Sequence, residues 1–397
     1  MKTFLYVIKY PLDDQYSIKK KVDGQVAAAG ALGLDVWQTA YDRHQTYLLH
    51  QGEKQPVKRI WLGRMPGYLH TKAFLDLFDT VERTLRRQHF DVVYMRHCPI
   101  SPKGIRMMRR IAKAGSQLVV EIPSFPLENE GKRNVLRRLY WAYSQHCWKR
   151  AAQYVTRFVV IGGPADSYLG RPAMNIDNGV DVEAIPLRQH EPAADGKIHF
   201  LALATMARWH GFDRLIQGVA QMQPELRRQL VVDMVGSDGD GSLPRWQQLV
   251  EEVGMQEYIR FHGYQTGKAL DAVFAGADVG ICSLGLHRHG YQTASHLKLR
   301  EYTARGLPFV YAGQDPSLPE EAPFCLRIPA DDSPVPMEEA LAFARRMRGQ
   351  AQIPGEMRRY ARENMSWEAP MKKALQMHVS PWKSKICVRC TAFLLMK

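Results

Sequence analysis

Two charged residues in the last third of the chain have the spacing of a ligand-binding pair. Lys298 and Glu301 lie three positions apart in a segment that predicts a helix over 296–304, with Ser295 as its N-cap residue. The free backbone amides at the start of such a helix favour an anion such as a phosphate. The lysine can neutralise that phosphate, and the glutamate can accept hydrogen bonds from a sugar hydroxyl. The alternative interpretation is a solvated ion pair on a surface helix.

A second basic group follows a predicted strand in the middle of the chain. Arg208 and His210 lie between the strand predicted over 199–204 and the helix predicted over 211–222. A guanidinium at that position can bind a diphosphate through two parallel hydrogen bonds. We therefore treat this loop as a candidate phosphate site, with an ordinary surface arginine as the alternative.

Polar residues also end two strands predicted in the first half of the chain. Arg96 ends the strand over 91–96 and His97 comes directly after it, and Glu121 lies at the end of a later strand. Each can orient an acceptor hydroxyl or move a proton, or it can be a buried structural group. Gly24 interrupts a helical pattern, where glycine is unfavourable, so a close approach of the backbone to a ligand is a reasonable hypothesis.

These residues lie on a regular alternation of predicted strands and helices. The alternation runs from Phe4 to Ile161 and restarts at His199, after a segment over 183–197 that contains prolines and no apolar period. It predicts an α/β protein with two tandem doubly wound, Rossmann-like domains and a ligand-binding cleft between them.

The expected domain bounds follow from that pattern. The first domain covers 1–185 and the second 186–365, and residues 366–397 form a C-terminal helix that returns to the first domain and a basic tail without an assigned role. Within the first domain, the pattern predicts a strand over 59–62 before the helix over 71–87.

The charge of the chain is strongly basic and locally concentrated. Its 54 Lys and Arg residues against 40 Asp and Glu give a net charge of +14. The excess is greatest from Arg106 to Arg150, which we call the basic face. This face suits an anionic membrane surface, a phosphate-bearing acceptor or nucleic acid. Aromatic residues among the charges fit a helix that lies at a membrane interface, and a solvated face with core aromatics is the alternative: Tyr140, Trp141, Tyr143 and Trp148.

Other features exclude several classes of protein. No apolar run reaches the roughly 18 residues of a membrane span. The apolar core within the first ten residues is too short for a signal peptide and is broken by Lys9. We therefore expect a cytoplasmic protein, with a peripheral place on the inner face of the cell membrane as a further option. The six cysteines are scattered, which argues against a disulfide framework. Cys387 and Cys390 have the spacing of a metal knuckle, but only His378 is near them, and zinc needs four ligands. We therefore expect no metal site.

Four short segments occur in a fixed order from the middle of the chain onward. They are Asn178-Gly179-Val180-Asp181, Arg208-Trp209-His210-Gly211, Val235-Gly236-Ser237 and the run from His296 to Pro308. Together they resemble the motifs of retaining, GT-B-fold glycosyltransferases of the group 1 or family 4 type. The resemblance extends to about His378.

The resemblance implies transfer of a sugar from a nucleotide-diphosphate sugar, with retention at the anomeric carbon and without a metal or other cofactor. By it, Glu301 binds the donor ribose, and Arg208 and Lys298 hold the diphosphate. Gly24 lets a first-domain loop approach the donor phosphates. The full expected set adds His210, Thr293 and Ser295 on the donor side, His97 as a catalytic residue, and Arg96 and Glu121 on the acceptor side.

The chain departs from the family pattern at Thr293. There the family usually carries a glutamate, eight positions before Glu301, which contacts the transferred hexose. The donor sugar is therefore left open.

The sequence offers no obvious covalent nucleophile, so we expect front-face transfer in which the leaving phosphate assists the incoming hydroxyl. The expected acceptor is a glycan or lipid-linked molecule, in cell-surface polysaccharide or glycolipid synthesis. The alternatives are a nucleotide-sugar epimerase on the same fold and a basic nucleic-acid-binding protein, although no nucleic-acid-binding motif is present and we expect no nucleic acid partner.

Overall fold

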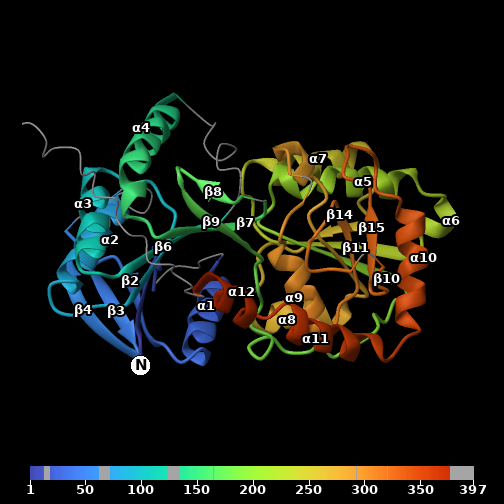
Figure 1. Cartoon of the computed structure of the whole chain (residues 1–397). Coiled ribbons are helices and arrows are strands. Elements are labelled where there is room, and N and C mark those ends of the chain that lie inside the picture. Colours follow the sequence, from blue (N-terminus) through green and yellow to red (C-terminus); the bar gives the residue numbers. More distant parts are fainter. Residues whose placement is uncertain are drawn as a thin grey trace, which may run out of the picture.

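The structure is a computed structural model, and it describes residues 1–12, 18–61, 72–123, 135–163, 165–291, 293–319 and 321–375. These residues form two α/β domains, each built around its own sheet (Figure 1). The predicted pair of doubly wound domains is therefore confirmed.

Nine strands form the sheet of the first domain, in the order β4-β3-β2-β1-β5-β6-β7-β9-β8. Six central strands, from β2 to β9 in this order, pair in parallel, and antiparallel strands extend both edges. The bounds are β1 Thr3–Val7, β2 Asp35–Tyr41, β3 Gln45–His50, β4 Glu53–Arg59, β5 Val92–Arg96, β6 Gln117–Ile122, β7 Arg157–Ile161, β8 Ser167–Tyr168 and β9 Arg171–Ile176.

Side chains of β1 alternate between two apolar cores, one on each face of this sheet. Phe4 and Tyr6 pack on the face covered by α1, and Leu5 and Val7 pack on the face covered by the other helices. The bounds are α1 Lys19–Ala31, α2 Lys72–Thr84, α3 Pro102–Lys113, α4 Val135–Ala151 and the short 3-10 helix η3 Ala152–Tyr154.

The second domain has a six-stranded, fully parallel sheet in the order β12-β11-β10-β13-β14-β15. In Figure 1, α5 and α7 lie above this sheet, and α8, α9 and α11 lie below it. The strands are β10 Ile198–Leu203, β11 Leu230–Val235, β12 Ile259–Phe261, β13 Val279–Ile281, β14 Phe309–Ala312 and β15 Cys325–Ile328. The helices are η4 Arg208–His210, α5 Phe212–Gln221, α6 Pro224–Arg227, α7 Ser242–Glu252, α8 Gly267–Gly276, η5 Leu286–His289, α9 Leu297–Arg305, α10 Met337–Arg348 and α11 Ile353–Asn364.

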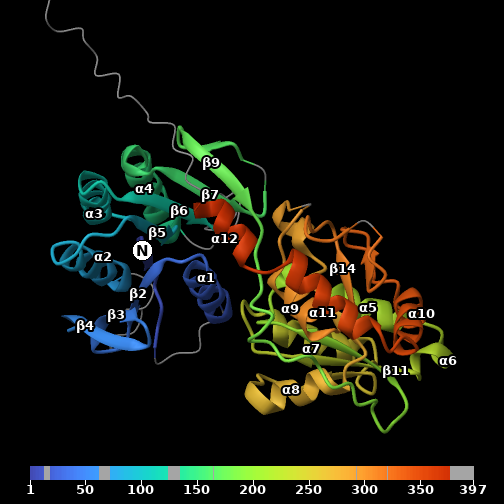
Figure 2. The ribbon, with the colours of Figure 1, turned by 60° about the horizontal axis from the view of Figure 1, so that its bottom comes forward.

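The last described helix, α12 (Glu368–Leu375), packs against α1 and β9 of the first domain (Figure 2). Trp367, just before it, is buried in the same core as Phe4 and Tyr6. The chain thus crosses between the domains twice, once after β9 and once after α11.

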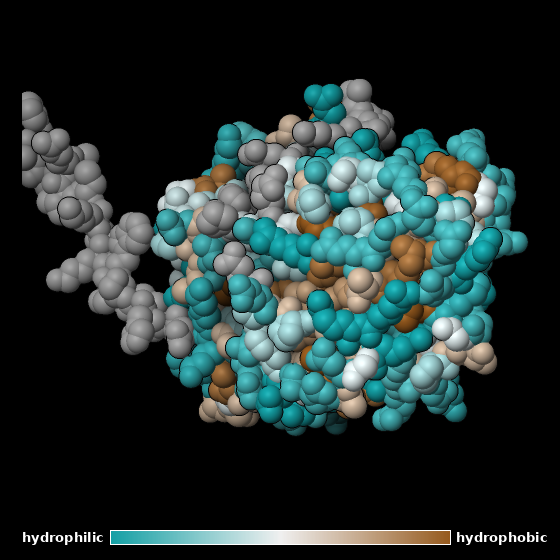
Figure 3. All heavy atoms as spheres, turned by 90° about the vertical axis from the view of Figure 1, so that its right-hand side faces the viewer, coloured by the Kyte–Doolittle hydropathy of each residue, from teal (hydrophilic) through white to brown (hydrophobic). Residues whose placement is uncertain are grey.

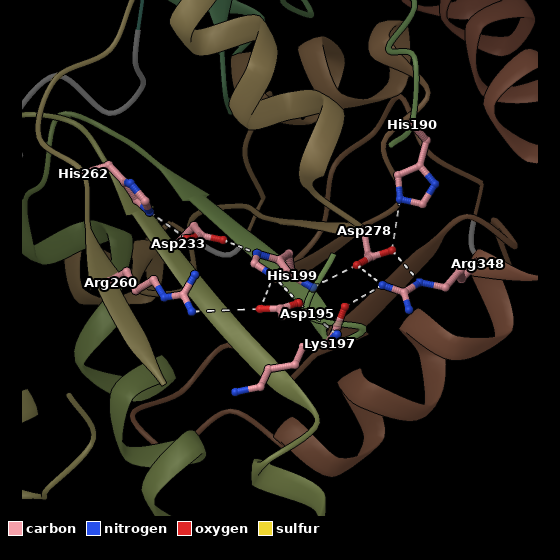
Figure 4. Close-up of polar contacts among 9 residues, drawn as sticks. All are labelled: His190, Asp195, Lys197, His199, Asp233, Arg260, His262, Asp278 and Arg348. Atoms are coloured by element: carbon pink, nitrogen blue, oxygen red, sulfur yellow. Dashed lines mark hydrogen bonds and ion pairs between the residues drawn. The ribbon is translucent and has the colours of Figure 1, made fainter. Parts of the chain in front are cut away.

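The segment over 177–197 joins the two sheets, and its later part is fixed to the second domain by hydrogen bonds between His and Asp side chains. His190 lies 3.1 Å from Asp278, and Asp195 lies 3.3 Å from His199 (Figure 4). These contacts tie a proline-containing linker to the start of β10 and β13.

One strand prediction in the first domain is wrong. Instead of a strand over 59–62, the chain forms the hairpin β3–β4, which ends at Arg59. Gln51 and Gly52 both have positive φ, 48° and 82°, as a tight hairpin turn requires. Strand β4 carries Pro56 and is mostly exposed, so it lacks the apolar alternation by which a strand is usually recognised.

Candidate active site

The amino end of α9 lies against the chain crossing that leaves the first domain. The helix begins at Leu297, and His296 occupies the N-cap position without a side-chain cap bond. The prediction that Ser295 caps the helix is therefore wrong. The Ser295 hydroxyl instead accepts a hydrogen bond from the backbone amide of Asn178, and the Ser295 carbonyl accepts one from the Asn178 side chain, each at 2.6 Å.

The two predicted phosphate-binding segments meet at Lys298. Its Nζ lies 3.0 Å from Nδ1 of His210, and the Ser283 hydroxyl also lies 3.0 Å from that nitrogen. Burial lowers the pKa of Lys298 to about 8, so the lysine is mainly charged at neutral pH. Burial and the Lys298 charge hold the pKa of His210 well below 6.5. A cation therefore donates to a neutral imidazole at the carboxyl end of β10.

Arg208 begins the 3-10 helix η4, two residues before His210. Its side chain is exposed and has no ion-pair partner among the described residues. It lines a pocket of about 460 Å³ with Arg288, Asp240 and Trp246, among others. The Arg288 guanidinium binds Asp213 at 2.7 and 2.9 Å. Arg208 is therefore the more available guanidinium at this edge of the sheet.

Glu301 faces the first domain. Its Oε1 accepts hydrogen bonds from Lys20 of α1 at 2.6 Å and from Arg305 at 3.3 Å. Lys298 and Glu301 share α9 as predicted, but their side chains have different partners, one inside the second domain and one across the domain boundary.

The carboxyl edge of the first sheet holds a buried ion pair. Glu121 is fully buried and accepts hydrogen bonds from Gln25 at 2.6 Å and from Tyr94 at 2.8 Å. Lys21 and Arg96 lie 3.0 and 3.3 Å from its other oxygen. Burial alone would raise the pKa of Glu121, but these two cations lower it to about 2. Arg96 and Glu121, both predicted on the acceptor side, thus bind each other.

His97 follows β5, as expected, but the residue is only 9% exposed, and its ring stacks on Trp148 with the centroids 4.5 Å apart. Burial and the charge of Arg96 lower the pKa of His97 to about 3. Its Nε2 has no hydrogen-bond partner among the described residues. The imidazole is therefore neutral and can act only as a neutral donor or acceptor.

Gly24 lies within α1 rather than in a loop, so that part of its prediction is wrong. A Cβ at Gly24 would lie 2.4 Å from Cδ1 of Trp367, and one at Gly179 would lie 2.6 Å from the same ring. Both glycines make room for a tryptophan that anchors the returning helix.

Thr293 lies beside the segment that follows β14. It forms an isolated β-bridge with Gln314, and the next amide, of Ala294, donates to the Gln314 carbonyl at 3.0 Å. Thr293 and Ser295 are thus on the same short stretch before α9.

Several residues that build this region were not predicted. Lys21 joins Glu121 to the Asn178 side chain, to which it donates at 3.0 Å, and Arg300 forms a fully buried ion pair with Asp315. Lys21 is the third of three consecutive lysines, where nothing in the sequence distinguishes the buried one. Arg300 and Asp315 lie 15 residues apart and have no local spacing signal.

Among the described residues, no group of three or more His, Cys, Asp and Glu side chains could hold a metal ion. Cys98, Cys147, Cys282 and Cys325 are free thiols. His378, Cys387, Cys390 and the basic tail over 379–397 lie outside the described residues.

Comparisons with known proteins identify the fold of the chain. A scan against protein-family models and a search of curated proteins found no match. Solved structures do match. Sucrose-phosphate synthase from Thermosynechococcus elongatus aligns with a TM-score of 0.65 and 16% identity over 95% of this chain and 97% of that one. A glycosyltransferase from Rickettsia africae aligns with a TM-score of 0.62 and 11% identity over 94% and 97%.

HepE from Anabaena, solved in complex with UDP, aligns with a TM-score of 0.57 and 12% identity over 94% of this chain and 98% of that one. A further HepE structure holds UDP-glucose. Since these structures match nearly the whole length of the chain at low identity, they report on its architecture. The chain has the two-domain GT-B fold of these glycosyltransferase structures.

Proposed function

We propose that this protein transfers a sugar from a nucleotide-diphosphate sugar to a glycan or lipid-linked acceptor, with retention of the anomeric configuration and without a metal. The observation that carries the proposal is the 3.0 Å contact between Lys298 and His210, which joins the amino end of α9 to the loop after β10. Both segments were predicted as phosphate sites, and the GT-B fold brings them together.

The charges of this region suit a departing diphosphate. As the bond from the anomeric carbon to the phosphate oxygen breaks, negative charge develops on that oxygen. Lys298, Arg208 and the amides at the start of α9 can stabilise this charge. In front-face transfer, the acceptor oxygen bonds to the anomeric carbon on the same face, and its proton passes to the departing phosphate oxygen.

In this proposal Glu301 receives the donor ribose. The Glu301 side chain is 18% exposed, and its carboxylate binds Lys20 and Arg305. Lys20 and Arg305 both donate to Oε1 of Glu301, so a ribose hydroxyl can donate to the other carboxylate oxygen, Oε2, or take the place of Lys20.

The proposed acceptor lies at an anionic membrane surface, which the basic face would contact. On α4, the apolar side chains Leu139, Tyr140 and Tyr143 are 62%, 38% and 48% exposed. Arg138, Lys149 and Arg150 are exposed on the same helix. Trp148 is fully buried, so its expected place at the interface is wrong. In contrast, the end of the second domain in Figure 3 is mainly hydrophilic.

Across the described ranges, no helix is both long and apolar enough to cross a bilayer. Contact through exposed side chains of α4 is therefore the form of membrane association that we propose.

The test starts with thermal unfolding in the presence of a panel of nucleotide-sugars (UDP-glucose, UDP-galactose, GDP-mannose and ADP-glucose). We expect one of them to raise the melting temperature. The stabilising donor is then incubated with the protein and followed by proton NMR. Slow release of the free sugar, formed first with the anomeric configuration of the donor, is the expected result.

Three outcomes would count against the proposal. Inversion of the first-formed sugar would exclude retention, and a glycosyl-enzyme trapped on a carboxylate would exclude front-face transfer. Conversion of the donor to its epimer without an acceptor would favour the epimerase alternative.

A further inference from the structure

His296, which was not among the predicted site residues, is held in one orientation at the amino end of α9. The residue is 8% exposed. Its Nδ1 lies 3.2 Å from Oδ2 of Asp315, and its backbone amide donates to the same oxygen at 2.9 Å. Its Nε2 is buried and has no hydrogen-bond partner among the residues that the structure describes.

Asp315 is fixed by a fully buried arginine. Arg300 donates to Asp315 at 2.9 and 3.2 Å, to the His296 carbonyl at 2.9 Å and to the Ser317 hydroxyl at 2.9 Å, and its Nε donates to the Asn178 carbonyl. The guanidinium thus has a partner for each of its three nitrogens. Burial would raise the pKa of Asp315, but the Arg300 charge and His296 hold it far below its usual range.

An ionised Asp315 decides which nitrogen of His296 carries the proton. A carboxylate only accepts hydrogen bonds, so the Nδ1 of His296 is protonated. In the neutral imidazole, Nε2 then offers a lone pair and needs a donor. A buried polar atom without a partner costs free energy, and such atoms are expected to have a functional or structural explanation.

The position of His296 indicates which donor it would meet. It lies three residues after Thr293, where the chain lacks the usual carboxylate, and two residues before Lys298. We propose that Nε2 of His296 accepts a hydrogen bond from a hydroxyl of the transferred sugar, and that Asp315 and Arg300 are positioning residues for it. The proposal rests on the proposed function and deepens it by adding a residue that determines sugar specificity.

Because Nε2 is enclosed in this structure, a hydroxyl reaches it only when neighbouring side chains move. Substitution of His296 should therefore alter the binding of the sugar part of the donor and leave the binding of the nucleotide part unchanged. This distinction allows a direct test with the donor that the nucleotide-sugar panel identifies, its nucleoside diphosphate, and its monodeoxy sugar analogues.

Three variants are compared. His296→Phe removes the acceptor nitrogen, and His296→Gln can retain an acceptor. Asp315→Asn removes the carboxylate that keeps the proton on Nδ1 of His296. Calorimetry should show that His296→Phe binds the nucleotide-sugar about five- to tenfold more weakly and the nucleoside diphosphate unchanged. His296→Gln should recover part of the loss. Asp315→Asn should resemble His296→Phe in this selectivity.

The deoxy analogues identify the contact even if a substitution also lowers the stability of the protein, because two donors are compared on the same variant. The wild-type protein should bind one monodeoxy donor about five- to tenfold more weakly than the parent donor, and His296→Phe should bind both equally. Discrimination that persists in His296→Phe, or an equal loss for nucleotide-sugar and nucleoside diphosphate, would overturn the role of His296 alone. If the wild-type protein binds no nucleotide-sugar, both this proposal and the proposed function fail.

Discussion

At the scale of residues, the buried ion pair of Glu121 with Lys21 connects the first domain to the chain crossing. Glu121 lies in β6, Lys21 lies in α1, and Lys21 also donates to Asn178 at 3.0 Å. A buried pair of this kind adds little stability by itself, but the loss of one partner leaves an uncompensated buried charge. We therefore expect Glu121 to stabilise the fold and to hold Lys21 in place.

Replacement of Glu121 by Gln should destabilise the protein by about 3–5 kcal/mol at pH 7, because Lys21 and Arg96 lose their counter-charge. The pKa of Glu121 is lowered from 4.5 to about 2, so its contribution is present above pH 4.5 and is lost as the pH falls toward 2. Urea unfolding at several pH values should show the difference between wild type and variant shrinking below pH 4.5.

Tyr94→Phe is the matched control, since it removes one hydrogen bond to Glu121 and no charge. It should cost about 1 kcal/mol and keep most of the pH dependence, because the charges of Lys21 and Arg96, which lower the pKa of Glu121 more than this hydrogen bond does, remain. A Glu121→Gln variant whose deficit stays constant from pH 7 to pH 2 would contradict the assignment.

The sequence indicated the residues of the site better than their contacts. Lys298 and His210 could be found because each lies at a helix or strand end with a recognisable spacing. The pairing of Arg96 with Glu121 could not be found, because it depends on the register of β5 with β6, in which the two residues are neighbours. Arg300 with Asp315 and Lys20 with Glu301 also depend on tertiary structure alone.

At the scale of elements, α1 packs closely against the start of α12 because glycine leaves room there for Trp367. Gly24 faces Trp367, whereas a Cβ at Gly30 in the same helix would have no atom within 4 Å. Replacement of these two glycines by alanine should therefore change the stability of the protein in opposite directions.

Gly24→Ala should destabilise the protein by about 1–3 kcal/mol, because the new methyl group overlaps Trp367. Gly30→Ala should stabilise it by about 0.5–1 kcal/mol, because alanine has the higher helix propensity. Denaturant unfolding of both variants measures the difference. If the two substitutions changed the free energy of unfolding by the same amount, the packing explanation for Gly24 would be wrong.

Most of the parallel strands and helices could be located along the chain within a few residues, because apolar runs alternate with helical patterns. The hairpins β3–β4 and β8–β9 were missed. Both turn through two consecutive residues with positive φ, Gln51-Gly52 and Leu169-Gly170, and only the glycine of each pair is a usual turn signal. Their strands are the two outermost at each end of the sheet, with β4 and β8 at the edges, and β4 is mostly exposed.

At the scale of the whole molecule, the exposed apolar residues of α4 belong to the first domain, while Lys298 and Arg208 belong to the second. In the proposed function, one domain holds the acceptor surface and the other holds the donor. The domain boundary, where Lys20 contacts Glu301, is then the place where the two substrates meet.

Binding to phosphatidylglycerol vesicles should depend on α4 and decrease with salt. Replacement of Arg138, Lys149 and Arg150 by Gln should weaken it by about 1 kcal/mol for each charge removed. Lys268→Gln, an exposed change on α8 of the second domain, is the control and should have little effect. A vesicle sedimentation assay measures the binding. If the triple variant binds as well as the wild type, or if the wild type binds neutral vesicles as well as anionic ones, α4 is not the membrane-binding surface.

Calorimetric titration with the stabilising nucleotide-sugar tests the central claim, that α9 binds the donor, most directly. We expect Lys298→Ala and Glu301→Ala to remain folded and to bind the donor at least about tenfold more weakly, because each loses a contact that involves a charged group. Glu339→Ala, an exposed glutamate on α10, should bind as the wild type does. Unchanged donor affinity in both Lys298→Ala and Glu301→Ala would contradict the account.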